Sequence, residues 1–321
     1  MSRRVALLGT RYPDLSIEEE VFGPAGIETI VVGADDIDEI VAATAGVAAI
    51  VAANRPRFTR QLLERLDCRV IVRAGIGVDS VDLDAARDLG YTVANVPDYG
   101  TEAVAQHTLA LALAATRRLV EADRIVRSGG WGFADLRPLH VPSAMTAGVV
   151  GFGRIGRRVA DLLGAVGFGS VVAHDAYVDP AASGTEARTL SELLAQSDVV
   201  CLHAPVPDDG GPLLGPAEIG SMRRGSALVN TSRGALVDQT ALADGLEAGA
   251  PRVAALDVFA PEPPDLTPFR GVEDRLILSP HMAWYTDESQ ADLRRKSAEE
   301  TVRIITGAGP AYPIVVPEEP T

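Results

Sequence analysis

Two successive series of short apolar runs, each alternating with helical patterns, constrain the fold of this chain more than any other feature. The first series occupies residues 4–96 and the second begins near Thr146. Strands that alternate with helices pair in parallel and carry helices on both faces of the sheet, so the sequence predicts two doubly wound α/β domains. The predicted strands are 5–8, 29–32, 49–51, 70–72, 92–96, 148–150, 170–173, 199–202, 227–230, 253–256 and 276–278.

The length and the connections also indicate two domains. A chain of 321 residues exceeds what one hydrophobic core usually supports. An Ala/Leu-rich helical stretch from Glu102 to Leu119 joins the series, and a charged helix from Asp287 to Thr306 precedes a Pro-containing tail. If that helix crosses back, residues 1–98 and 287–321 form one domain, and residues 99–286 form a second domain inserted into it.

Three helix starts carry N-terminal signals. Ser16-Ile17-Glu18-Glu19 and Thr189-Leu190-Ser191-Glu192 both have capping-box spacing, in which the hydroxyl and the carboxylate each satisfy an unpaired backbone N–H. Asp238 is a favourable N-cap before a further helical pattern. We expect helices to begin at these three places.

The composition excludes several functions. A formal net charge of −15 opposes phosphate binding, so no nucleic-acid partner is predicted. No run approaches the roughly 18 apolar residues of a membrane span, and the start does not resemble a signal peptide. Two cysteines, Cys68 and Cys201, indicate a reduced compartment. These features indicate a cytoplasmic protein. No Cys/His cluster has metal-ligand spacing, so we expect no bound metal.

A glycine-rich turn follows the first strand of the second series. Its residues are Gly151-Phe152-Gly153-Arg154-Ile155-Gly156, and a helical pattern continues to Leu163. Such glycines permit a tight turn, close approach of a pyrophosphate and contact between helix and strand, while the helix N-terminus offers free N–H groups. Asp175 lies 19 residues beyond Gly156, where a carboxylate can accept ribose hydroxyls and would repel a 2′-phosphate. The pattern predicts a dinucleotide site that prefers NAD to NADP.

Three further segments place ionisable residues just after predicted strands. They contain Arg233, then Asp257 with Glu262, then His281. Open α/β sheets bind ligands at the carboxyl ends of their strands, so we expect these side chains to lie near one another.

The motifs in these segments resemble those of the D-isomer-specific 2-hydroxyacid dehydrogenases. Arg-Gly-x-x-Val-Asp begins at Arg233, Asp-Val-Phe-x-x-Glu-Pro begins at Asp257, and Pro-His ends at His281, all behind the glycine-rich turn. The His-x-Ala-Trp-Tyr element looks most like the branch that includes the C-terminal-binding-protein corepressors. The resemblance covers essentially the whole chain and implies a flavodoxin-like substrate domain with an inserted Rossmann domain that binds NAD.

The resemblance also implies roles. Arg233 would hold the substrate carboxylate, His281 would act as acid and base, and Glu262 would orient His281. This chemistry suits reduction of a 2-oxo acid, because hydride addition develops negative charge on the carbonyl oxygen. A guanidinium can bind a carboxylate with two parallel hydrogen bonds. Other residues implied to lie beside the cofactor are Ala204, Pro205, Thr231, Ser232 and Asp257.

A substrate-binding loop is implied in the first domain, where Arg73-Ala74-Gly75-Ile76-Gly77 follows a strand. Backbone N–H groups of such a turn can bind an anion. Two interpretations of Arg73 stay open: a second cation for the substrate, or a structural partner of Asp79 or Asp98. Trp284 likewise forms either a wall of the substrate pocket or an interdomain contact.

Two rival functions stay open. One is an NAD(H)-sensing scaffold like the corepressors, and the other is an enzyme that oxidises phosphite. A formate dehydrogenase is disfavoured, because those relatives carry Gln at the position of Glu262. The resemblance implies a homodimer with the long helices after Tyr99 at its interface. Four other histidines have no partners at family spacing and are interpreted as structural: His107, His140, His174 and His203. Which 2-hydroxy acid is the substrate does not follow from the residues.

Overall fold

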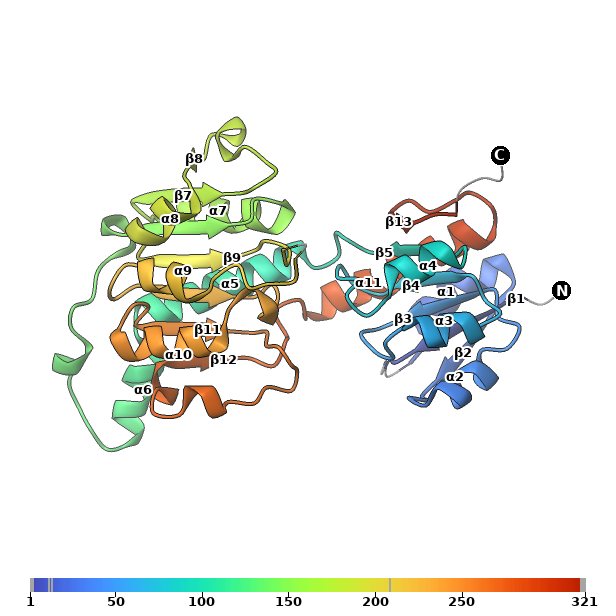
Figure 1. The fold of residues 1–321 in the computed structure, drawn as a ribbon, viewed down its shortest axis with the longest axis horizontal. Coiled ribbons are helices and arrows are strands. Elements are labelled where there is room, and N and C mark those ends of the chain that lie inside the picture. Colours follow the sequence, from blue (N-terminus) through green and yellow to red (C-terminus); the bar gives the residue numbers. More distant parts are fainter. Residues whose placement is uncertain (1–2, 11, 13, 208, 318–321) are drawn as a thin grey trace. The chain divides into compact units, whose positions relative to one another are not determined.

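The computed structural model describes residues 3–10, 12, 14–207 and 209–317. The chain divides into two units, Met1–Gly100 with Thr286–Thr321, and Thr101–Tyr285. In each unit, helices cover both faces of a twisted sheet (Figure 1). The last four residues of the predicted 287–321 segment lie outside the described residues, as do the first two residues of the chain.

The first unit has a sheet of order β2-β1-β3-β4-β5-β13. Its five N-terminal strands are parallel and follow the flavodoxin-like order, which confirms the predicted fold. The predicted tail contains an additional strand, β13, which pairs antiparallel with β5 and was not expected. The elements are β1 (Arg3–Leu8), α1 (Ser16–Phe22), β2 (Ile27–Val32), α2 (Ile37–Ala43), β3 (Ala49–Ala52), α3 (Arg60–Arg65), β4 (Val70–Arg73), α4 (Leu83–Asp88), β5 (Thr92–Asn95), α11 (Asp287–Ile305) and β13 (Pro313–Val315).

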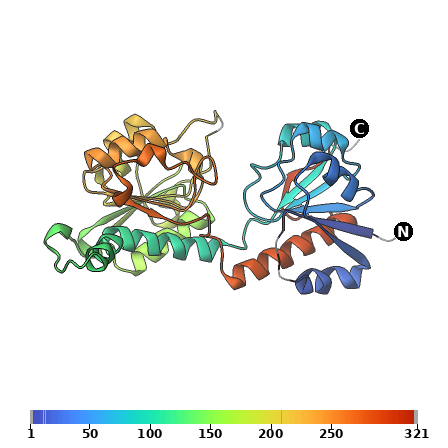
Figure 2. The same ribbon diagram turned by 90° about the horizontal axis from the view of Figure 1, so that it is seen from below.

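The C-terminal helix α11 returns to the first unit, where it packs on α1, β3 and β4. Figure 2 shows α11, in red, on one face of this sheet and the blue-to-cyan helices α3 and α4 on the other. A buried ion pair fastens α11 to α1: Arg294 Nε donates to Glu18 Oε1 at 2.9 Å, and Arg294 Nη2 donates to Glu18 Oε2 at 2.5 Å. Two parallel charge-assisted bonds compensate for taking both groups out of water.

The capping box predicted at Ser16 is wrong. The N-cap of α1 is Leu15, and Ser16 is already the first helical residue. The Ser16 hydroxyl donates to Asp14 at 2.6 Å instead of accepting a backbone bond. Asp14 thus binds both the hydroxyl and the N–H of Ser16, while the neighbouring Glu18 is buried in its pair with Arg294.

The second unit has a sheet of order β8-β7-β6-β9-β10-β11-β12. All neighbouring pairs of these strands are parallel, and the order matches the dinucleotide-binding arrangement with one strand added at the β12 edge. The elements are α5 (Thr101–Thr116), α6 (Leu119–Arg127), β6 (Thr146–Val150), α7 (Arg154–Ala165), β7 (Ser170–His174), β8 (Glu186–Ala187), α8 (Leu190–Gln196), β9 (Val199–Leu202), α9 (Pro216–Ser221), β10 (Ala227–Asn230), α10 (Gln239–Ala248), β11 (Val253–Leu256) and β12 (Leu276–Leu278).

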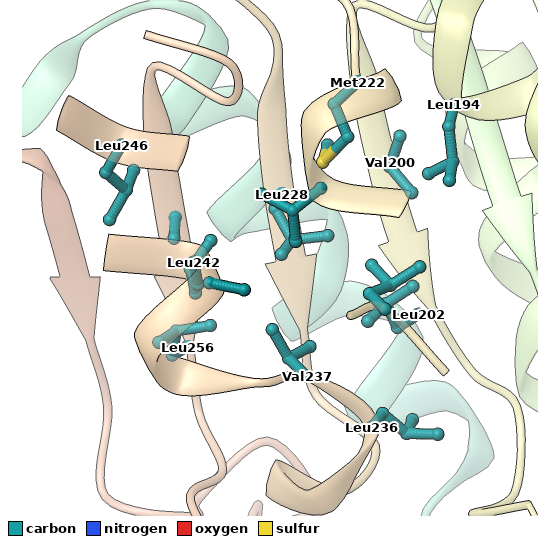
Figure 3. Packing of buried hydrophobic residues seen from close by; sticks show 14 of the residues in the cluster. Leu194, Val200, Leu202, Met222, Leu228, Leu236, Val237, Leu242, Leu246 and Leu256 are labelled. Atoms are coloured by element: carbon teal, nitrogen blue, oxygen red, sulfur yellow. The ribbon is translucent and has the colours of Figure 1, made fainter. Parts of the chain in front are cut away.

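Alternation along the central strands gives this unit two cores, one on each face. Val199 and Cys201 of β9 pack with residues of α5 and α7, whereas Val200 and Leu202 face α8, α9 and α10. Figure 3 shows the second of these cores, with Leu228 of β10 facing Leu242 of α10. Because both faces are buried, these strands are apolar runs without polar alternation. That property made their ends predictable.

The N-terminal helix signals predicted in this unit are confirmed, unlike the one at Ser16 in the first unit. The predicted capping box at Thr189 is confirmed, because its hydroxyl accepts from Glu192 N–H and the Glu192 carboxylate accepts from Thr189 N–H. Asp238 caps α10 as predicted. The predicted helical stretch from Glu102 to Leu119 is α5, which ends three residues earlier at Thr116; Arg118 then adopts a left-handed backbone with φ of 53° and is the N-cap of α6.

Two further predictions concern membrane spans and the state of the cysteines. Among the described residues, no helix is both long and apolar enough to cross a bilayer. Cys68 and Cys201 are free thiols and both are buried. Burial raises the pKa of the Cys201 thiol to about 12, which keeps it protonated.

Candidate active site

The predicted cofactor and catalytic residues of the second unit follow the carboxyl ends of β6, β7, β9, β10, β11 and β12. Parallel strands bring these ends to one edge of the sheet. The strand order reverses between β6 and β9, and open α/β sheets bind their ligands at such a switch point. The sheet topology therefore gathers residues that lie far apart in sequence.

The glycines of the turn after β6 have distinct surroundings. A Cβ on Gly151, whose φ is 91°, would overlap the backbone of Ala204, and a Cβ on Gly156 would overlap the carbonyl of Gly151. Both residues must therefore be glycine for the turn to close. Gly153 is exposed and has no neighbouring atom within 4 Å of a Cβ position. That open side leaves room for a pyrophosphate to approach the backbone.

Helix α7 begins immediately after this turn. Gly153 is its N-cap and supplies no side chain to bond the first-turn N–H groups. These N–H groups and the positive end of the helix dipole favour an anion. Arg154 is the first helical residue and is exposed, which adds a positive charge there. The turn and helix fit the diphosphate of a dinucleotide.

Asp175 directly follows β7 and bonds to the glycine-rich turn. Its carboxylate accepts from the N–H of Phe152 at 2.5 Å, of Tyr177 at 2.8 Å and of Val178 at 2.9 Å. Partial burial raises the pKa of Asp175, but these three donors outweigh burial and hold the pKa below its usual value. The side chain is therefore a fixed anion beside the cofactor turn.

The loops after β9 and β10 are joined by side-chain hydrogen bonds. The Ser232 hydroxyl donates to the Ala204 carbonyl at 3.0 Å. The Asn230 amide accepts from Ser232 N–H at 3.0 Å and donates to the Arg233 carbonyl at 2.8 Å, which shapes the turn that carries Arg233. Pro205 is exposed beside Ala204. Near these loops, burial lowers the pKa of His203 to about 3, so its ring stays neutral.

The Arg233 turn packs against the loop that carries Glu262. A Cβ on Gly234 would overlap the backbone of Phe259, so glycine is required for this close approach. Phe259 N–H in turn donates to Glu262 Oε1 at 3.0 Å. Arg233 itself is half-buried, and its Nη1 donates to the Ser232 carbonyl at 2.8 Å.

Glu262 and His281 form a direct pair. His281 Nδ1 lies 2.7 Å from Glu262 Oε2, and both side chains are about one-third exposed, at 34% and 35%. A carboxylate on Nδ1 fixes the tautomer and leaves Nε2 for a ligand. The packing of Gly234 on Phe259, the Phe259–Glu262 bond and the Glu262–His281 contact place the three predicted loops next to one another, whereas the joint role of Arg233, Glu262 and His281 stays a prediction.

The His281 backbone is strained and is held by Asp257. Its φ of 54° lies in the left-handed region, which costs a residue other than glycine about 1–2 kcal/mol. His281 N–H donates to the Asp257 carbonyl at 2.8 Å, and the N–H groups of Met282 and Ala283 donate to the Asp257 carboxylate, each at 2.9 Å. Asp257 is 1% exposed. The implied place of Asp257 beside the cofactor stays a prediction, whereas its hydrogen bonds to the His281 loop are direct.

His107 belongs to this site, although no sequence motif assigned it a partner. Its Nε2 lies 3.1 Å from Ser279 Oγ and 3.7 Å from Asp257 Oδ1. The residues in contact are 172 positions apart, so no local spacing could reveal them. By contrast, His174 bonds a backbone carbonyl at 3.0 Å, that of Arg188.

The predicted substrate residues lie in different units. Trp284 follows the His281 loop, and its ring contacts that of Tyr285 edge-on, with centroids 5.7 Å apart. Residues 73–77 follow β4 in the first unit. There Arg73 is buried and donates to Asn54 and to the Ala74 carbonyl, beneath Gly75, whose φ is 147°. Asp98 pairs with Lys296 at 3.1 Å. The roles of Arg73 and Trp284 stay predictions.

Comparisons with known proteins agree with this arrangement. Residues 109–283 match the family model described as D-isomer specific 2-hydroxyacid dehydrogenase, NAD binding domain. A glyoxylate reductase of Aeropyrum pernix is 37% identical over 78% of this chain and 79% of its own length. A D-3-phosphoglycerate dehydrogenase of Mycobacterium leprae is 37% identical over 74% of this chain but 44% of its own length. The chain thus spans about half the length of the D-3-phosphoglycerate dehydrogenases that it matches.

A solved structure shows the same fold over nearly the whole chain. The crystal structure of a Thermus thermophilus protein, 32% identical, covers 97% of this chain and 100% of its own with a TM-score of 0.86. The fold, the glycine-rich turn and the family match agree that NAD is the cofactor of the second unit. This chain belongs to the D-isomer-specific 2-hydroxyacid dehydrogenase family.

Proposed function

We propose that this protein reduces a small 2-oxo acid to the D-2-hydroxy acid with NADH, and catalyses the reverse reaction with NAD. The observation that carries the proposal is the 2.7 Å contact of Glu262 with His281, at the sheet edge that also bears the dinucleotide turn. The names of the relatives support the substrate class, because both act on acids of this kind.

His281 is the proton donor and acceptor of this reaction. Bound NADH supplies the hydride. As negative charge develops on the carbonyl oxygen, the His281 imidazolium gives it a proton from Nε2, and the neutral ring takes that proton back in oxidation. Glu262, on Nδ1, orients the ring and stabilises its positive charge.

Arg233 binds the substrate carboxylate. Its planar guanidinium can make two parallel bonds to a carboxylate and places a fixed positive charge beside the reacting centre. The turn that carries it is held by Asn230 and by the packing of Gly234 on Phe259. A substrate gripped in this way presents its 2-oxo group to His281 in a defined orientation.

The activity is tested with purified protein and NADH against a panel of 2-oxo acids that includes glyoxylate, hydroxypyruvate and a phosphorylated acid. We expect NADH loss with at least one of them and a product of D configuration where C2 is a stereocentre. In the reverse assay with NAD, phosphite serves as the control. The proposal would be contradicted if NADH were consumed with none of the acids, or if phosphite were the only compound to support NAD reduction.

Asp175 should determine the preference for NADH. Its fixed carboxylate would repel the 2′-phosphate of NADPH, so the parent should have a higher kcat/KM with NADH. Asp175→Asn removes the charge but keeps one acceptor oxygen, enough for the N–H groups of Tyr177 and Val178, and it should narrow the preference with less loss of stability than Asp175→Ala. Equal kcat/KM for the two cofactors in the parent enzyme would refute this role.

We further propose a homodimer through α6 and residues 128–133 that follow it. Support comes from large apolar side chains exposed along one stretch, among them Trp131 at 92% and Phe133 at 63%. Exposed apolar side chains concentrated in this way are typical of an interface, and a two-fold axis would bury the same stretch on both copies. Light scattering should give twice the chain mass for the parent and a lower mass for Trp131→Ser.

A further inference from the structure

We propose that two adjacent residues of α5, His107 and Thr108, position the two catalytic loops. Thr108 holds the loop of Arg233, and His107 holds the loop of His281. The proposal rests on the proposed roles of those two catalytic residues. Neither His107 nor Thr108 is argued to touch substrate; each acts through the loop that it contacts.

The first contact is a buried hydroxyl pair. Thr108 Oγ1 donates to the Val104 carbonyl at 2.8 Å within its own helix. Its single proton is thereby used, so it accepts from the Thr231 hydroxyl, also at 2.8 Å. Thr108 is fully buried and Thr231 is 8% exposed, so water does not replace this bond readily. Thr231 lies two residues before Arg233.

The second contact is a chain of donors that ends on Asp257. Ser279 Oγ donates to Asp257 Oδ1 at 2.5 Å, so this hydroxyl accepts from His107 Nε2 at 3.1 Å. The direction of both bonds requires His107 to carry a proton on Nε2. Ser279 lies two residues before His281, and the same carboxylate binds the two residues after it.

The hydrogen bonds from His107 through Ser279 to Asp257 matter because the His281 backbone is strained. A left-handed backbone at a residue other than glycine persists only where its surroundings over-determine it. Asp257 supplies the bonds on both sides of His281, and His107 is the group that ties Ser279 to a helix. Loss of the His107 contact should let the imidazole move relative to Glu262.

Helix α5 is suited to this role because it is a fixed element. It packs on β9, β10 and β11 through a buried face that includes Ala105, Leu111 and Ala112. Consecutive helical residues point about 100° apart, so neighbours on this helix can reach two different loops. One rigid helix thus sets the positions of both loops. Turnover requires catalytic groups to be placed to within a fraction of an ångström.

Four variants and one control test this proposal. Thr108→Val removes the acceptor with nearly unchanged volume, and Thr108→Ser retains the hydroxyl. His107→Leu removes the donor, and His107→Gln retains one. Gln106→Ala is the matched control, because this exposed neighbour on α5 bonds to Glu102 and not to either loop. Measurements are kcat, KM, the pH profile of kcat/KM, affinity for oxamate with NADH bound, and melting temperature.

We expect the two positions to differ in kind. Thr108→Val should raise KM and weaken oxamate binding roughly tenfold with a smaller change in kcat, since it loosens the Arg233 turn. His107→Leu should lower kcat roughly 10- to 100-fold and shift the alkaline limb of reduction to lower pH, since it separates His281 from Glu262. Thr108→Ser and His107→Gln should recover most of each loss, and Gln106→Ala should match the parent.

If both Thr108→Val and His107→Leu lower kcat and raise KM to the same extent, and neither Thr108→Ser nor His107→Gln restores them, the effect is simple helix destabilisation and the proposal is overturned. Unchanged kinetics in Thr108→Val and His107→Leu would do the same. NMR of the His281 ring in the NADH complex reports the loop without turnover. An altered His281 signal in His107→Leu, but not in Thr108→Val, supports the positioning role even if no 2-oxo acid is reduced. Unaltered signals in both variants overturn it, so the two proposals fail separately.

Discussion

His281→Ala should lower kcat for reduction of a 2-oxo acid by roughly 10²–10⁴-fold, the usual contribution of general acid–base catalysis. In the proposed mechanism the ring donates the proton to the carbonyl oxygen, and alanine would leave water as the only source. NADH affinity should change little, because the glycine-rich turn and Asp175 that would hold the cofactor follow β6 and β7, whereas His281 follows β12.

His140→Ala is the matched control for this measurement. His140 is an exposed histidine of the same unit, outside the strand ends that form the site, so its loss should leave kcat unchanged. Stopped-flow measurement of the chemical step removes product release as a confounding factor. A His281→Ala protein with near-normal kcat on a verified substrate would show that another group donates the proton.

Arg233→Ala should damage binding and turnover together. Each hydrogen bond between a guanidinium and a carboxylate contributes about 1.5–3 kcal/mol, so loss of two lowers kcat/KM by roughly 10²–10⁴-fold. Part of the loss should appear in KM, because the ground-state carboxylate is bound. Part should appear in kcat, because the positive charge also stabilises the developing oxyanion.

Arg233→Lys separates charge from geometry. Lysine keeps the positive charge but cannot form the planar pair of bonds, so we expect an intermediate kcat/KM. Melting temperatures of both variants should stay close to that of the parent, since the turn is shaped by the Asn230 side chain and the Gly234 contact. If Arg233→Ala kept its KM for the 2-oxo acid, another group would hold the carboxylate.

Much of the fold could be predicted because the relevant signals are local. The β9, β10 and β11 strands are buried on both faces and are apolar apart from Asn230, so their ends coincide with the ends of apolar runs. The Thr189 capping box spans three residues and needs no distant partner. The pair of Glu262 with His281 was predicted from family motifs, because topology brings the carboxyl ends of these parallel strands together.

Features that depend on distant contacts were missed. Glu18 pairs in the core with Arg294 of the last helix, a contact that the local sequence around Ser16 does not reveal. β13 forms because the tail meets the free edge of β5. His107 contacts Ser279 across 172 positions, and only the fold shows that an isolated histidine on a helix contacts the loop that carries His281.

We propose that His281 carries the proton and that Glu262 stabilises its charged form. This central claim is tested most directly by kcat/KM against pH in both directions for the parent and for Glu262→Gln. Reduction in the parent should fall as pH rises, because it needs the imidazolium, and oxidation should fall as pH drops, because it needs the neutral ring. Glu262→Gln keeps a hydrogen-bonding group without the charge, so both limbs should move to lower pH and reduction at neutral pH should suffer more. Limbs that run in the same direction in the parent, or that stay in place in Glu262→Gln, would contradict it.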